Sequence, residues 1–167
     1  FKLLNAGLRR SAVGSSDSHS LRTKPSGYPR TCFDLGIDDP RQVEPSMIRD
    51  GLVAGSSTIS GGILLQLEGA QPGDEVAAGT LALTVDVQAP SWVQASQLEI
   101  IVSGNTVDTV ALEPAASSGA GKHFHHDAEV SHSSGQWVIF HVRGAGDLSP
   151  LHPGREPFAV ANPIYAL

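Results

Sequence analysis

The chain has 167 residues, of which 40% are hydrophobic and 5% aromatic, enough for one domain with a largely aliphatic core. Its formal net charge is −6 and its 11 Lys and Arg residues are scattered, which excludes a nucleic-acid partner, because phosphate binding needs clustered basic residues. No apolar run approaches the length of a membrane span, so we expect no membrane partner, and the single cysteine excludes an internal disulfide.

The first segment predicts the end of a helix followed by a strand. Gly7 is suited to close a helix, and the small residues 11–15 favour a strand that leads to Asp17-Ser18-His19. Side chains at positions i and i+2 share one face of a strand, so the carboxylate of Asp17 and the imidazole of His19 would point the same way. Both groups are ligands suited to zinc, manganese or iron. In the alternative interpretation, Asp17 caps a turn and His19 is a surface histidine.

A loop rich in Ser, Gly and Pro is expected at residues 20–27, and a helix further on. Asp39 can cap that helix, with Pro40 in its first position. Pro45 would remove one backbone donor from it, so a short turn that restarts at Pro45 and ends at Gly51 is the alternative.

From residue 62 onward the pattern indicates only β-structure. Hydrophobic and polar residues alternate without a break over residues 81–88, as in a half-buried antiparallel strand. Residues 113–122 are expected to form a loop. Further strands are expected at residues 63–67, 98–103, 106–112, 124–130, 136–142 and 158–165. Short strands at such regular spacing predict a β-sandwich over residues 61–167.

A histidine-rich stretch lies in this second part. His123 and His125 would share one strand face, which is a geometry that a metal could use, but we interpret the stretch as a solvated strand edge. Trp92 and Trp137 are expected to pack in the core or between domains. Carbohydrate stacking is the alternative for these two tryptophans, and it would require exposed side chains.

Three motifs together resemble one known family. They are G-S-S-D-S-H at residues 14–19, G-Y-P-R-T at residues 27–31 and P-F-A-V-A-N-P-I-Y at residues 157–165. They resemble the C-terminal part of metal-dependent hydrolases of the PHP (polymerase and histidinol phosphatase) superfamily, in particular the subgroup of carbaryl-type ester and carbamate hydrolases. The resemblance implies an α+β protein, in which residues 1–60 are a C-terminal strand-helix remnant of a PHP-type (β/α) barrel and residues 61–167 an accessory β-sandwich.

The resemblance also implies a chemistry. Asp17 and His19 would be ligands of a centre with two or three divalent metal ions (Zn, Mn or Fe), and metal-activated water would hydrolyse a phosphoester, carboxylester or carbamate bond. Arg30 would be a catalytic and substrate-binding residue that holds an anionic phosphate or a developing oxyanion, and Tyr28 would line the substrate pocket. The alternatives are a structural role for Arg30 and simple loop packing for Tyr28.

One departure from the family pattern concerns the remaining metal ligands. The family supplies them from earlier segments, including an H-x-H pair, but the 16 residues before Asp17 contain no histidine and no acid. One Asp and one His are too few ligands for a stable catalytic site. We therefore expect a C-terminal portion that is inactive alone and needs an N-terminal PHP portion, as a separate chain or a cleaved segment. The hypothesis from a different class is a non-catalytic β-sandwich module for binding or homo-oligomerisation.

Overall fold

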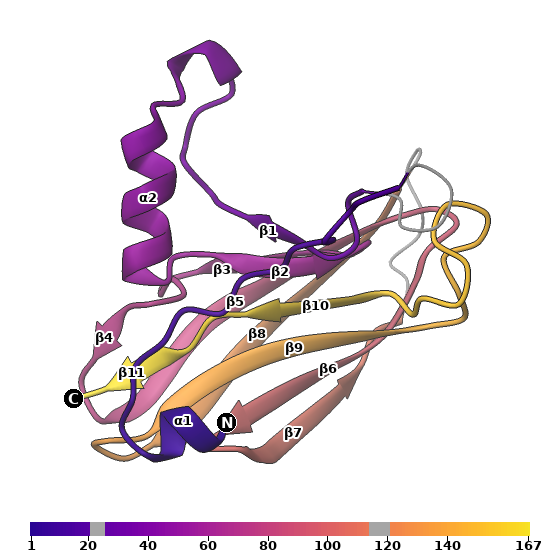
Figure 1. The fold of residues 1–167 in the computed structure, drawn as a ribbon. Helices are drawn as coiled ribbons and strands as arrows, with labels where there is room; N and C mark the ends of the chain where they lie inside the picture. Colours follow the sequence, from indigo (N-terminus) through magenta and orange to yellow (C-terminus); the bar gives the residue numbers. More distant parts are fainter. Residues whose placement is uncertain (21–25, 114–120) are drawn as a thin grey trace.

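The computed structural model describes residues 1–20, 26–113 and 121–167, so most of the two loops expected at residues 20–27 and 113–122 lies outside the described part. Strands dominate this part of the chain (Figure 1). The helices are α1 (Lys2–Asn5), the 3-10 helix η1 (Pro40–Gln42) and α2 (Pro45–Ala54). The strands are β1 (Arg30–Cys32), β2 (Thr58–Gly61), β3 (Leu64–Glu68), β4 (Glu75–Val76), β5 (Gly79–Pro90), β6 (Gln94–Val102), β7 (Asn105–Ala111), β8 (Gly121–His132), β9 (Trp137–Ala145), β10 (Phe158–Ala161) and β11 (Ile164–Ala166).

These strands form two sheets. The larger sheet has the order β1-β2-β10-β9-β11-β4, and β6 pairs with both β9 and β7. Its strands are antiparallel except for the parallel pair β11 and β4. The smaller sheet has the order β3-β5-β8 and is antiparallel throughout. The long pairing of β5 with β8, from Gly79↔His132 to Pro90↔Gly121, makes β8 an edge strand of this sheet.

The core lies between the inner faces of the two sheets. Val85 and Val87 of β5 belong to the same buried cluster as Phe140 and Val142 of β9. All four are at most 1% exposed, and burying an aliphatic or aromatic side chain of this size contributes about 1.5–3 kcal/mol. The hydrophobic residues that alternate over residues 81–88 form the inward face of β5. The pattern therefore predicts this strand correctly.

The predicted α+β class, with a barrel remnant in residues 1–60, is wrong. Among the described residues the helices are short, and β1 and β2 join the larger sheet beside β10 from the other end of the chain. The strand expected at residues 11–15 is also absent, because this backbone bonds to side chains instead of to a strand. Local sequence cannot show a pairing between strands about a hundred residues apart. No helix in the described residues has the length and apolarity to cross a membrane.

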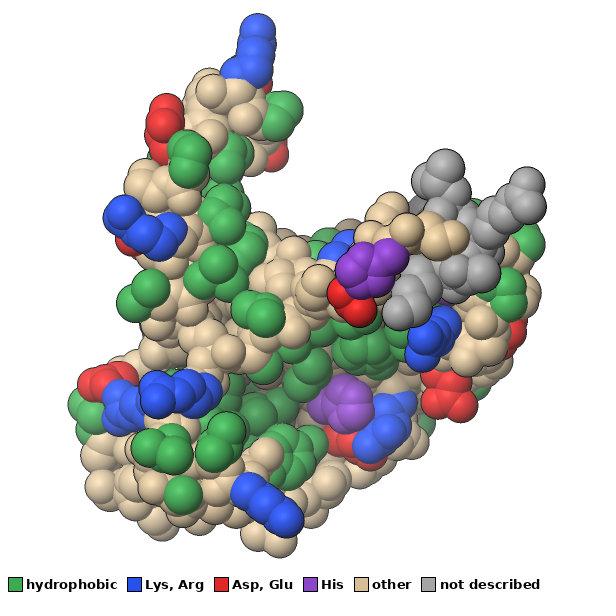
Figure 2. All heavy atoms as spheres, viewed as in Figure 1, with side chains coloured by type: hydrophobic (Ala, Val, Ile, Leu, Met, Phe, Trp, Pro, Cys, Tyr) green, Lys and Arg blue, Asp and Glu red, His purple; other side chains and the backbone are tan. Residues whose placement is uncertain are grey.

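An arm, which we define as residues 33–54, projects from the two sheets (Figure 1). Its helix α2 begins at Pro45 and ends at Ala54, and the following Gly55 is left-handed (φ 77°), so the turn expected to end at Gly51 is part of a longer helix. Phe33 packs against Gly51, where a Cβ atom would lie 2.9 Å from the Phe33 ring. Figure 2 shows hydrophobic side chains along the projecting arm. Half-buried apolar residues of the arm are Phe33, Leu35, Ile37, Val43, Met47, Ile48 and Leu52, and Val53 is 81% exposed.

Candidate functional site

Asp17 and His19 lie together, as the sequence predicts, although they are not on a strand. Nε2 of His19 is 2.7 Å from Oδ1 of Asp17, and both side chains are largely exposed, at 69% for His19 and 73% for Asp17. Asp17 has a left-handed backbone (φ 47°), which turns the chain at this point. A carboxylate oxygen and an imidazole nitrogen therefore stand side by side at the surface.

The segment that carries this pair is held to the sandwich by two side chains. Oγ1 of Thr31 accepts a hydrogen bond from Gly14 N (2.9 Å) and donates one to Gly14 O (3.1 Å). Asn162 bonds in the same reciprocal way to the backbone of Ala12. Position 14 must be glycine for this approach, since a Cβ atom there would lie 2.7 Å from Ile59 and 3.0 Å from the backbone of Arg30. Gly14 thus lies beside Thr31 of β1, and Ala12 lies beside the connection between β10 and β11.

The pair fits a divalent metal as two ligands of a larger set. Oxygen and nitrogen donors of this kind suit Zn, Mn or Fe, and the exposure leaves room for further ligands. Within residues 1–20, 26–113 and 121–167, however, no three His, Cys, Asp or Glu side chains are grouped so that they could hold a metal ion. Catalytic metal sites use at least three protein ligands, so Asp17 and His19 do not make up such a site by themselves.

Tyr28 is half-buried in the loop before β1. Its hydroxyl donates to the carbonyl of Glu156 (2.7 Å), and its ring meets Phe158 edge-on, with centroids 5.8 Å apart. The ring also covers Gly61, where a Cβ atom would lie 2.7 Å from it. Burial raises the pKa of the Tyr28 hydroxyl, and the nearby Arg155 guanidinium opposes part of this rise. The structure thus places Tyr28 against the loop that precedes β10.

Arg30 is exposed at the start of β1, opposite Ser60 of β2. Within the described part of the chain, no Asp or Glu forms an ion pair with its guanidinium. Cys32, two residues further, is half-buried, and burial raises the pKa of its thiol, so the thiol stays protonated and is not an activated nucleophile. Arg30 is therefore an exposed cation of β1 without a carboxylate partner among the described residues.

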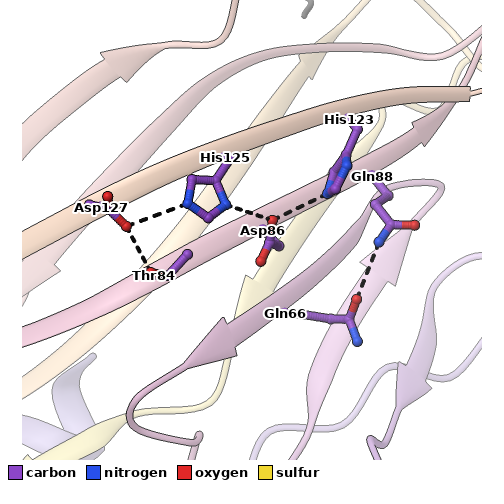
Figure 3. Close-up of polar contacts among 7 residues, drawn as sticks. All are labelled: Gln66, Thr84, Asp86, Gln88, His123, His125 and Asp127. Atoms are coloured by element: carbon purple, nitrogen blue, oxygen red, sulfur yellow. Dashed lines mark hydrogen bonds and ion pairs between the residues drawn. The ribbon is translucent and has the colours of Figure 1, made fainter. Parts of the chain in front are cut away.

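A second polar cluster lies on the outer face of the smaller sheet (Figure 3). Oδ1 of Asp86 is 3.2 Å from Nε2 of His123 and 3.1 Å from Nδ1 of His125, and Asp127 approaches the other side of His125 at 3.5 Å. Asp127 accepts a hydrogen bond from Thr84 (2.7 Å). The hydrogen bond to Asp86 is the main reason why the pKa of His125 is raised. His123 and His125 do share a face of a solvated edge strand, as expected.

Asp86 is the member of this cluster that sequence reasoning missed. It lies 37 residues before His123, and the contact exists only because β5 and β8 pair with Asp86 opposite His125. The available signal was the polar position of Asp86 within the alternating strand, on the face opposite the core.

No family model, no curated protein and no solved structure matches the chain. The functional assignment therefore depends on the residues themselves and on the motif resemblance.

The two tryptophans have different environments. Trp137 is 2% exposed, and its Nε1 donates to Oδ1 of Asn5 (2.9 Å), while the ring of Phe1 lies 5.0 Å away. Trp92, at the turn between β5 and β6, is 52% exposed, contrary to the packing expected for it. The packing expected of Trp137 is observed, so a carbohydrate-stacking role is open only to Trp92.

Proposed function

We propose that the chain is the C-terminal portion of a metal-dependent hydrolase that cleaves a phosphoester, carboxylester or carbamate bond. In this proposal Asp17 and His19 supply two ligands of a centre with two or three divalent ions (Zn, Mn or Fe). An N-terminal portion with PHP-type sequence supplies the remaining ligands. The observation that carries the proposal is the exposed contact of 2.7 Å between Asp17 Oδ1 and His19 Nε2, on a segment fixed to the sandwich.

The state of His19 decides how this pair could accept a metal. With Asp17 as a carboxylate, which can only accept a hydrogen bond, the contact requires the tautomer of His19 that has its hydrogen on Nε2. A metal ion needs the lone pair of Nε2, and the proton must therefore leave this atom or be replaced by one on Nδ1. When bound, the metal would lower the pKa of a water ligand and polarise the bond under attack. Asp17 and His19 would hold and orient it.

The arm supports the need for a second portion. Its apolar side chains are half-buried or exposed, and α2 stands away from both sheets (Figures 1 and 2). Apolar surface of this extent in one projecting element is typical of an interaction site. We propose that the N-terminal portion covers the arm and brings its own ligands to Asp17 and His19, while Arg30 holds the anionic or developing negative charge of the substrate and Tyr28 borders the pocket.

The test uses the complete native assembly, purified by gel filtration. We expect at least two metal ions per complex by elemental analysis and hydrolysis of p-nitrophenyl acetate or bis(p-nitrophenyl) phosphate. Asp17→Ala and His19→Ala should each lower the metal content and reduce hydrolysis by at least a hundredfold. Because both side chains are exposed, the midpoint of thermal unfolding should stay the same when wild type and variants are compared without metal.

The matched control is Glu129→Gln, an exposed carboxylate of β8 outside the site. It should leave metal content and hydrolysis unchanged. A native complex whose metal content and hydrolysis are the same in Asp17→Ala would refute the metal-ligand role. That result would favour the non-catalytic module for binding or oligomerisation, for which the apolar arm is the supporting observation.

A further inference from the structure

A cleft opens where one end of the smaller sheet meets the outer strands of the larger one. Its volume is about 610 Å³, within the range of small-molecule sites. The strand register explains its position: Leu64 pairs with Gln88, and Gln88 with His123, so the start of β3, the end of β5 and the start of β8 lie side by side. Arg30 of β1 borders the cleft from the larger sheet.

The cleft offers apolar as well as polar surface to a ligand. Leu64 and Pro90 are its exposed apolar side chains, whereas Ile63 and Ala89 are buried at 0% and 4% exposure. Such a surface favours a hydrocarbon or aromatic group over water by roughly 25 cal/mol per Å² of apolar area that the ligand buries.

Among the described residues, the side chains that line the cleft with a formal charge at pH 7 are the basic Arg30 and Lys122. Arg30, Lys122 and His123 line the cleft, and no Asp or Glu of the described residues does so. This is unexpected for a chain with a net charge of −6. Arg30 and Lys122 approach the cleft from different sheets, and neither forms an ion pair with a carboxylate of the described residues. Like charges that face one cleft repel each other, and a bound anion would remove this cost.

Two of the basic groups are held in place. Nζ of Lys122 donates to the carbonyl of Val93 (3.0 Å), which leaves two of its N–H groups for another acceptor. Nε2 of His123 lies 3.2 Å from Oδ1 of Asp86, which fixes the orientation of the ring. Donors that are already positioned lose less side-chain entropy when a ligand binds.

We propose that this cleft binds a small organic anion, with its carboxylate or phosphate between Arg30 and Lys122 and its apolar part on Leu64 and Pro90. The site shares Arg30 with the proposed hydrolytic centre but includes neither Asp17 nor His19, and it does not depend on a metal. The ligand class is thus an amphiphilic anion such as an aromatic or aliphatic carboxylate or phosphate monoester. Arginine suits either anion, because its planar N–H donors match two oxygens at once.

The test is a titration of the metal-free chain with phenyl phosphate, benzoate and the neutral benzyl alcohol, followed by amide chemical shifts. We expect saturable binding of at least one of the two anions, with shifts at Ile63, Leu64 and His123, and no saturable binding of benzyl alcohol. Comparison of the two anions decides between phosphate and carboxylate. Arg30→Gln and Lys122→Gln should each weaken the binding by about tenfold, because each removes one charged donor.

Two controls separate this proposal from the others. Arg49→Gln removes a basic residue of the arm, outside the cleft, and should leave the affinity unchanged. Asp17→Ala should also retain full anion binding, so failure of the metal proposal and failure of this one are distinguishable. Arg30 is exposed, so its variant should fold normally. Equal affinity of the wild type and Arg30→Gln, or equal binding of benzyl alcohol, would overturn the proposal.

Discussion

The side-chain amide of Asn162 forms two hydrogen bonds with the backbone of Ala12. Ala12 N donates to Oδ1 of Asn162 (2.7 Å), and Nδ2 of Asn162 donates to Ala12 O (3.1 Å). The same Nδ2 donates to the carbonyl and the hydroxyl of Ser57, at 3.2 and 2.9 Å. Asn162 is 2% exposed, so one buried amide joins the segment that carries Asp17 to the start of β2 and to the connection between β10 and β11.

Replacing this amide should destabilise the fold and loosen the segment. In Asn162→Ala, the buried hydroxyl of Ser57 loses its hydrogen bond and the backbone of Ala12 loses two, and we expect the free energy of unfolding to fall by about 2 kcal/mol. Urea unfolding measures this loss. Hydrogen exchange should accelerate at the amides of Ala12 and Gly14 well before global unfolding.

The matched control is Asn105→Ala, at an exposed asparagine at the start of β7. This variant should change the free energy of unfolding by less than about 0.5 kcal/mol. Unchanged exchange at Ala12 in Asn162→Ala would mean that Thr31 and Gly14 hold the segment without help from Asn162.

The hydrophobic period alone was sufficient for β5 and its neighbours. Leu81 to Val87 alternate with polar residues because one face of the sheet packs on the core and the other meets water. It was insufficient for β1 and β2, which have three and four residues and contain small or polar side chains. Their place in the larger sheet is set by pairing with β10, and no local pattern records such a pairing.

The sequence likewise predicts some contacts of the candidate site and not others. The contact of Asp17 with His19 followed from a separation of two residues, but the strand alternation used to predict it is absent; a left-handed turn at Asp17 is found instead. Asp86 and Lys122 could not be assigned from sequence. Asp86 lies beside His125 only because of the register of β5 with β8. Lys122 and Arg30 line the same cleft only because the two sheets meet there.

The charge of Asp86 should be visible in the titration of His125. The hydrogen bond from His125 to this carboxylate raises the pKa of the imidazole, and the charges of Asp86, Asp127 and Glu68 act in the same direction. Asp86→Asn keeps an acceptor but removes the charge, so the pKa of His125 should fall toward its usual value near 6.5. Proton NMR of the imidazole Cε1–H measures this shift.

The sign of the stability effect follows from the raised pKa. The folded state binds the His125 proton more tightly than the unfolded state, so this contribution is complete below pH 6.5 and is lost as the pH rises through the folded pKa. Asp86→Asn should reduce that dependence. His141 is the internal reference, because its pKa is lowered by burial in a different sheet and should not move. An unaltered His125 titration in Asp86→Asn would rule out the role given to Asp86.

Glu99 should make the fold sensitive to acid. Burial raises the pKa of its carboxyl, but hydrogen bonds from Arg143 Nε (2.9 Å) and from His141 Nδ1 (3.0 Å) outweigh burial, so that the pKa is lowered overall. The stabilisation from Glu99 is therefore present above its usual value of 4.5 and lost as the pH falls through the folded pKa. His141 adds to this from pH 6.5 downward, because burial disfavours its charged form in the folded state.

Glu99→Gln separates these two contributions. It should lower the free energy of unfolding at pH 7 by about 2 kcal/mol, since a carboxylate with 14% exposure loses its charge-assisted bonds to Arg143 and His141. It should also flatten the fall in stability below pH 4.5. Urea unfolding from pH 3.5 to 8 measures both effects, and Glu129→Gln, an exposed carboxylate of β8, should retain the wild-type profile. If Glu99→Gln keeps the full acid dependence below pH 4.5, other carboxylates govern acid unfolding and the ionisation of Glu99 does not contribute to it.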